Sequence, residues 1–277
     1  MQFKTILVHL DDSRRAGDRL RFATTIAAIS QAHVAALRVL PPLPPYGGMS
    51  AEGGVLAMKL MQEARKAGIE QARARFEEEA RRTGYPVELR MANGDPAAVM
   101  GLHGRYADLV IAGQADPDDG LSMAPDFVAR LVMNLPKALL VLPYAGTPPT
   151  QARRILIAWD GSREAARAVN NALPFLSAAQ DIRVVSYNGR ENPEEFAGEP
   201  GADLALYLAR HGLNIKVEQR TSPDRDIGGR LLSEAADLDS DLIVMGAYSH
   251  SRAYEFVMGG VTRTVLEAMT VPVFMAH

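Results

Sequence analysis

The sequence predicts an α/β protein made of two tandem five-stranded parallel-sheet domains with helices on both faces. Two observations lead to this fold class. Short apolar runs typical of buried strands alternate with segments of helical period along the whole chain. The strand patterns of the first half also recur, in the same order, in the second half. Such sheets bind their ligands beyond the carboxyl ends of the strands.

Three segments of the first half have partners in the second half. Residues 3–13 match 153–162, residues 107–113 match 240–246, and residues 138–143 match 271–276. Three matches in one order indicate two copies of a single unit. Glycine and proline in residues 145–152 predict a short linker, so we expect domains at 1–145 and 152–277.

Local patterns justify each element of the first copy. A strand over 4–10 ends at Asp11-Asp12-Ser13, which predicts the N-cap of a helix over 14–29. Proline and glycine exclude regular structure from 41–48. A long charged helix is predicted over 53–83, with these apolar residues near helical spacing: Leu60, Ala64, Ala72, Phe76 and Ala80. The other predicted elements are strands 34–39, 87–91, 108–112 and 138–142, and helices 96–105 and 126–134. The second copy repeats this order with a shorter second helix near 202–211.

Composition excludes several classes of function. The chain has 277 residues, of which 47% are hydrophobic, enough for two cores. A net charge of −3 argues against nucleic acid as a partner. The absence of cysteine excludes disulfides and thiolate chemistry, and it fits a cytoplasmic protein. We find neither a signal-peptide pattern nor an apolar run near the ~18 residues of a membrane span, so no membrane partner is expected.

Residues 240–266 contain the candidate ligand site. An apolar strand over 242–245 ends at Gly246, and a polar loop then leads to Gly259 and Gly260, which open a helix. Unpaired backbone N–H groups and the positive end of the dipole favour an anion at a helix start, and glycine lets the backbone approach it. Trp159-Asp160-Gly161, at the end of the first strand of this copy, meets the same loop. Trp159 either stacks on a base there or only covers the sheet.

The second half resembles the universal stress protein family, and the whole chain resembles its tandem two-domain form. The family signature is a glycine, two residues, a second glycine, nine residues, and then a glycine followed by Ser or Thr. Gly246 takes the first place and Gly259 the third, whereas Ser249 replaces the second glycine and Gly260 the hydroxyl residue. Asp160 corresponds to the aspartate that contacts adenine in the nucleotide-binding members.

This resemblance implies domains of the adenine nucleotide alpha hydrolase-like fold, paired as an intramolecular pseudo-dimer through residues 138–142 and 271–275. It implies ATP or AMP as the cofactor. The site residues that it implies are Ala158, Asp160, Met245, Gly246, Ser249, Gly259, Gly260, Val261 and Thr262. The hydroxyl lost at Gly260 is worth about 1 kcal/mol as a hydrogen bond, and Ser249 or Thr262 can supply one instead.

The first copy has diverged further from the family pattern. Asp126 and Phe127 stand opposite the glycine pair, and the carboxylates of loop 116–126 would repel a phosphate. Asp11 matches the adenine-contacting aspartate in position, but we interpret it as a helix cap. We therefore expect no nucleotide in the first copy, which serves as the structural partner of the second.

No other chemistry is predicted. The histidines lack metal-ligand spacing, and the Asp116, Asp118 and Asp119 cluster is interrupted by Pro117 and not closed by a glutamate, so no metal is expected. His250 is interpreted as a solvated loop histidine. No catalytic constellation indicates an enzyme, and any ATP hydrolysis would be weak and incidental.

Two functional classes remain open. In one, a stress-response protein binds an adenine nucleotide in the second domain and acts as a sensor or regulator. In the other, the chain is a nucleotide-free interaction scaffold for an unidentified protein partner, and homodimers are compatible with either class. Ser249 and Gly260 discriminate between them. If restoring Gly and Ser at these positions creates or greatly strengthens nucleotide affinity, the natural protein is the scaffold.

Overall fold

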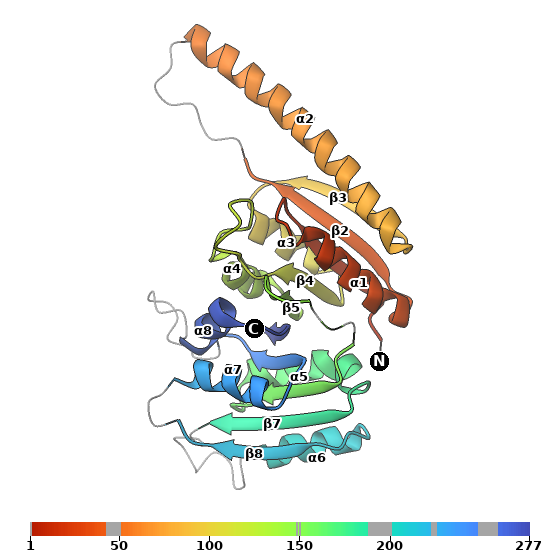
Figure 1. Cartoon of the computed structure of the whole chain (residues 1–277), viewed down its shortest axis with the longest axis vertical. Helices are drawn as coiled ribbons and strands as arrows, with labels where there is room; N and C mark the ends of the chain where they lie inside the picture. Colours follow the sequence, from red (N-terminus) through yellow and green to blue (C-terminus); the bar gives the residue numbers. More distant parts are fainter. Residues whose placement is uncertain are drawn as a thin grey trace.

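The computed structural model describes residues 2–42, 51–147, 149, 151–187, 201–222, 226–248 and 260–277. Ten strands form one sheet in the order β3-β2-β1-β4-β5-β10-β9-β6-β7-β8 (Figure 1). We call the β1–β5 half copy one and the β6–β10 half copy two. The predicted fold class is confirmed, because strands and helices alternate in both copies and helices cover both faces of the sheet.

The elements of copy one are β1 (Thr5–Leu10), α1 (Ala16–Ser30), β2 (His33–Leu40), α2 (Ala51–Thr83), β3 (Val87–Asn93), α3 (Pro96–Gly104), β4 (Leu109–Gly113), α4 (Phe127–Asn134) and β5 (Leu139–Leu142). Those of copy two are β6 (Arg154–Ala158), α5 (Arg163–Leu176), β7 (Asp181–Tyr187), α6 (Ala202–Arg210), β8 (Lys216–Arg220), α7 (Ile227–Asp237), β9 (Leu242–Gly246), α8 (Gly260–Ala268) and β10 (Val273–Ala276). None of these helices combines the length and the apolar character that crossing a membrane requires.

The two copies join through their last strands, as the resemblance implied. Every strand pair within a copy is parallel, whereas β5 and β10 pair antiparallel, with Val273 opposite Val141 and Met275 opposite Leu139. Both central strands are fully buried, because helices cover both faces of the sheet here. The molecule is therefore a pseudo-dimer within one chain.

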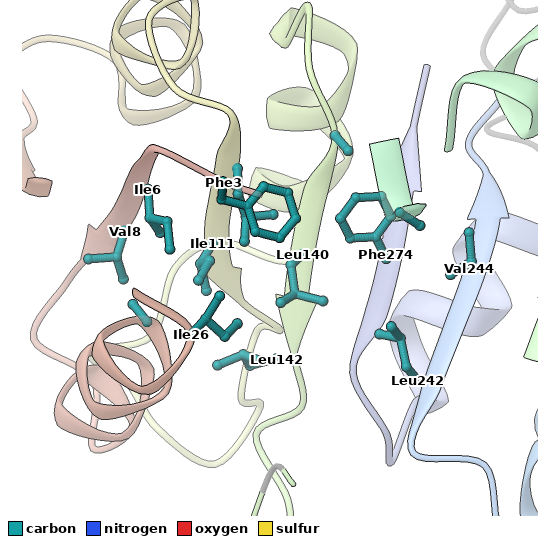
Figure 2. Close-up of a cluster of buried hydrophobic side chains, with 14 of the residues drawn as sticks. Phe3, Ile6, Val8, Ile26, Ile111, Leu140, Leu142, Leu242, Val244 and Phe274 are labelled. Carbon is teal, nitrogen blue, oxygen red and sulfur yellow. The ribbon is translucent and has the colours of Figure 1, made fainter. Parts of the chain in front are cut away.

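An aromatic cluster fills the junction of the copies on the face of α1 and α5. The ring of Phe175 lies 5.3 Å from Phe3 and 5.7 Å from Phe274, measured between centroids. Phe3 belongs to copy one and the other two rings to copy two, so the apolar layer continues across the junction. Figure 2 shows this layer, with Phe3 of copy one and Phe274 of copy two among its buried side chains.

Helix α2 packs on the sheet only through its carboxyl-terminal part. Ala72 and Phe76 are buried, but Leu60 and Ala64 are exposed although they share the same helical spacing. A helix of 33 residues is ~50 Å long, whereas the seven-residue strand β3 spans only ~23 Å. The amino-terminal part of α2 therefore extends past β3, as Figure 1 shows.

Truncation of Phe274 tests the contribution of the junction to stability. We expect Phe274→Ala to lower the free energy of unfolding by about 3–5 kcal/mol, because the ring is fully buried between the copies. Urea denaturation followed by circular dichroism measures this change. Leu206→Ala is the control, since this leucine is 59% exposed on α6 and should cost less than about 0.5 kcal/mol. Equal effects of the two substitutions would contradict this account of the junction.

Candidate functional site

The predicted site lies at the carboxyl ends of β6 and β9, which are neighbours in the sheet. Ala158 is paired with Met245 at the ends of these strands. Strand β6 continues toward α5 and β9 toward α8, and the strand order reverses between them. In doubly wound sheets this reversal opens a crevice that the carboxyl ends of both strands line.

Asp160 follows β6 and is held by the start of α5. Its Oδ1 accepts hydrogen bonds from the Ser162 backbone N–H at 2.9 Å and from the Ser162 hydroxyl at 2.6 Å. The same hydroxyl oxygen accepts from the Ala165 N–H at 3.1 Å and so caps α5. Gly161 between them has a φ of +71°, in the left-handed region that favours glycine. The turn therefore fixes the Asp160 carboxylate while leaving this residue exposed.

Gly246 ends β9 beneath the first turn of α5. A Cβ at this position would lie 2.7 Å from the Ala165 nitrogen and 3.0 Å from the carbonyl carbon of Glu164. Glycine is thus required for the close approach of helix to strand. Met245 before it is buried in the core on the same face as Ala158.

The start of α8 forms the other border of the crevice. Gly260 is exposed, and a Cβ there would meet no atom of the described residues within 4 Å. Val261 is partly buried, and Thr262 is only 4% exposed. The Thr262 hydroxyl oxygen accepts from the Tyr248 N–H at 3.3 Å, so this side chain fastens the end of β9 to α8. Tyr248 has a φ of +57°, which is uncommon for a residue other than glycine.

Three residues of the predicted loop, Ser249, His250 and Gly259, lie outside the described residues. Trp159 packs on the core beneath α5 and α6, whereas Ala158 and Val261 pack on the face of α7 and α8. The tryptophan therefore covers the opposite face of the sheet from the crevice, which favours the covering role over base stacking.

The corresponding crevice of copy one is filled by two rings. His9 stands at the position of Ala158, and Phe127 at that of Gly260, when the two copies are superposed by their sequence repeat. The His9 and Phe127 rings are in contact, with their centroids 4.6 Å apart and their planes tilted by 40°, and both residues are buried. Copy two has small residues at both positions, so the equivalent space there is not filled by these side chains.

A buried ion pair completes this filling of copy one. The Arg19 guanidinium donates to Asp11, and it also donates to the His9 carbonyl at 3.2 Å. It lies against Gly113, the counterpart of Gly246, where a Cβ would come within 2.5 Å of Arg19 Nη1. Both partners of the pair are less than 10% exposed. Ala168 replaces this arginine in copy two, which leaves Asp160 uncovered.

The prediction that Asp11 caps the first helix is wrong. Helix α1 has Arg15 as its N-cap, without a side-chain cap hydrogen bond. Asp11 instead accepts from Ser13 and Arg19. Burial opposes ionisation of Asp11, but the adjacent Arg19 charge and the hydrogen bonds outweigh it and lower the pKa of this carboxyl below its usual range.

The carboxylates of the copy-one loop are balanced by Arg14. Its guanidinium donates to Asp116 at 2.8 Å, and its backbone N–H donates to Asp119 at 2.7 Å. These contacts hold the loop against the end of β1. Within the described part of the chain, no three His, Asp or Glu side chains are grouped to hold a metal ion.

Sequence reasoning missed His9 and Arg19 as the residues that close copy one. One signal was available, because aligning the repeats places His9 and Phe127 opposite residues with almost no side chain. Arg19 carried no such signal, since an arginine in an amphipathic helix is usually solvated.

The Universal stress protein family model matches residues 2–123 and 151–277. Universal stress protein Slr1230 of Synechocystis sp. is 27% identical over 150 residues, which make up 52% of this chain and 48% of that relative. The chain thus spans about half the length of this curated relative.

Two solved structures share the fold across the whole chain. A universal stress protein from Archaeoglobus fulgidus DSM 4304 matches with a TM-score of 0.70 and 14% identity, covering 98% of this chain and 95% of that chain. A putative universal stress protein from Pseudomonas aeruginosa UCBPP-PA14 matches with a TM-score of 0.58 and 19% identity, covering 98% and 92%.

The His9 ring makes the stability of copy one depend on pH. Burial lowers the pKa of His9 to about 3 in the folded protein, against about 6.5 when unfolded. The unfolded chain then binds more protons below pH 6.5, so the stability present above this pH is lost as the pH falls. We expect wild type to lose up to about 2 kcal/mol more than His9→Phe between pH 6.5 and 5.

Urea denaturation at pH 7, 6 and 5 measures this difference in the free energy of unfolding. His211→Phe is the matched control, because this histidine lies exposed on copy two and its substitution should keep the wild-type pH dependence. Parallel pH profiles for wild type and His9→Phe would show that His9 does not stay neutral in the folded protein.

Proposed function

The chain belongs to the universal stress protein family, and we propose that it binds an adenine nucleotide, ATP or AMP, in copy two. In this proposal the domain over 152–277 senses the nucleotide and acts as a regulator in the stress response. The domain over 1–145 is its structural partner. The observation that carries the proposal is the difference between the copies: rings and an ion pair fill the crevice of copy one, while small residues line that of copy two.

The polar groups of copy two suit the two ends of a nucleotide. The exposed start of α8 at Gly260 offers backbone N–H groups and the positive end of a helix dipole to phosphates. Across the crevice, the Asp160 carboxylate is held in place and can accept from an amino group, as the corresponding aspartate contacts adenine in nucleotide-binding members of the family. Ala158 between them is a small, partly buried residue at the end of β6.

Two observations favour the alternative, a nucleotide-free interaction scaffold. The packing of α5 alone requires Gly246, and the Thr262 hydroxyl oxygen already has a protein partner. These two signature-related residues therefore have structural roles that need no ligand. The scaffold hypothesis predicts that the crevice stays empty at physiological nucleotide concentrations, so direct titration distinguishes the two functions.

The first experiment is calorimetric titration of nucleotide-stripped protein with ATP and with AMP. We expect one site of micromolar affinity in wild type and an affinity about 10–100-fold lower in Asp160→Ala, because a hydrogen bond to a charged group is lost. Asp237→Ala is the matched control. This exposed aspartate ends α7 shortly before β9 begins, so it lies near the amino ends of the strands and away from the crevice at their carboxyl ends.

The possible results of this titration are distinct. Two sites would show that copy one also binds. Absence of heat, together with an unchanged melting temperature at millimolar nucleotide, would overturn the proposal in favour of the scaffold.

A second test transfers the filled crevice of copy one into copy two. We expect Gly260→Phe to abolish ATP binding, because its ring would occupy the space that Phe127 occupies in copy one. Folding should be retained, since none of the residues that the structure describes has an atom within 4 Å of the new Cβ. Gly260→Ala is the control and should bind ATP. Calorimetry and thermal unfolding measure both properties, and full ATP affinity in Gly260→Phe would place the nucleotide elsewhere.

A further inference from the structure

We propose that Gln114 of copy one is a positioning residue for the ligand site of copy two. Its side-chain amide holds the carboxyl-terminal end of α8, the helix whose amino-terminal end borders the crevice. This inference rests on the proposed function, because it concerns how strongly that crevice binds a phosphate-bearing ligand.

The Gln114 amide group caps the last turn of α8. Its Nε2 donates to the carbonyl oxygens of Leu266 at 2.9 Å and of Glu267 at 3.2 Å. These carbonyls belong to the last four of the helix, which lack partners within it. The residue is only 6% exposed, so protein groups rather than bulk water satisfy the amide.

Copy one fixes the amide in the orientation that this cap requires. Gln114 Oε1 accepts from the Tyr144 N–H at 3.2 Å, and the Gln114 N–H donates to the Leu142 carbonyl at 2.8 Å. The two helix carbonyls need a donor and the Tyr144 N–H needs an acceptor, so the network determines which end of the amide faces α8. The ends of β4 and β5 thus anchor the helix to the sheet of copy one.

The other anchors of α8 come from copy two. Thr262 accepts from the Tyr248 N–H near the amino end of the helix. Thr264 packs closely on α7, because a Cβ added at Gly228 would lie 2.7 Å from the Thr264 Cβ. The helix has nine residues and is ~13 Å long, so it moves as a rigid rod. A shift at its carboxyl end therefore displaces the N–H groups at its amino end.

The cap that Gln114 of copy one places on α8 of copy two has no equivalent at the matching position of copy two. The counterpart of Gln114 in copy two is Ala247, whose methyl group cannot donate to the last carbonyls of α4. Copy one therefore supports the helix start of copy two without receiving the same support. The asymmetry matches the difference between the crevices, because the supported helix is the one that begins with the exposed Gly260.

The test compares ATP with adenosine, which lacks phosphates, in Gln114→Leu. This substitution keeps the volume of the side chain and removes the cap. We expect ATP affinity to fall about two- to tenfold while adenosine affinity is unchanged, because only the phosphate contacts depend on the start of α8. Hydrogen exchange should become faster in α8 but not in α4.

Tyr85→Phe is the matched control. The Tyr85 hydroxyl donates to the carbonyls of Ala27 and Ala32 at the end of α1, so its loss also removes a cap in copy one, but far from α8 in the sequence and on another helix. The ATP to adenosine ratio should not change in this variant. If Gln114→Leu does not fold, Gln114→Asn withdraws the amide by one methylene and is expected to show the same selective loss of ATP affinity.

Each outcome separates this inference from the proposed function. A wild-type protein that binds neither ATP nor adenosine overturns both. A wild-type protein that binds ATP, together with an unchanged ATP to adenosine ratio in the Gln114 variants, overturns the positioning role alone. An equal loss of affinity for both ligands also overturns it, since general destabilisation would then explain the effect.

Discussion

The antiparallel pairing of β5 with β10 is the contact on which the rest of the architecture depends. It places the last strand of each copy in the middle of one continuous sheet, where both strands are fully buried. Two parallel five-stranded sheets would otherwise each expose an apolar edge at this position, and such edges promote aggregation. The same pairing brings the carboxyl end of α8 within reach of Gln114. The strand pairing that completes the core is therefore also the contact that places Gln114 of copy one against α8 of copy two.

The two crevices differ although the two copies share one order of strands and helices. Copy one occupies its crevice with its own side chains, which are the His9 and Phe127 rings and the Asp11–Arg19 pair. A buried ion pair adds little net stability, since desolvation of both charges offsets their attraction. The pair instead gives the Asp11 carboxylate and the His9 carbonyl, at the end of β1, a hydrogen-bond donor from the protein itself. Copy two keeps the shorter Ala158 and Ala168 at these places, so its aspartate remains exposed.

The sequence was sufficient to predict the elements and the repeat, because these depend on hydrophobic period and on order along the chain. The pairing of the copies came from the resemblance to a family and not from these patterns. It was insufficient where a long-range contact overrides a local preference. Asp11 has the sequence context of a cap, but Arg19 competes for it across a turn of helix. The face of α2 has the correct period at Leu60, but the sheet ends before the helix does. Gly246 fits an anion-binding signature and also a packing requirement, and only coordinates show the neighbouring α5 backbone. The loop residues Ser249 and Gly259 remain predictions.

A ligand changes a protein's state only through different affinities for two arrangements, so the moving element must contact both the ligand and the responding part. Helix α8 meets this requirement in the described structure. Its first turn borders the crevice, its middle packs on Gly228 of α7, and its last turn is bound by Gln114. Strand β9 is less suited to such a role, because it lies between β6 and β10 and cannot shift without breaking two ladders. Among the elements that the structure describes, α8 is therefore the one that could transmit an effect of a nucleotide to copy one, through the hydrogen bonds at its carboxyl end.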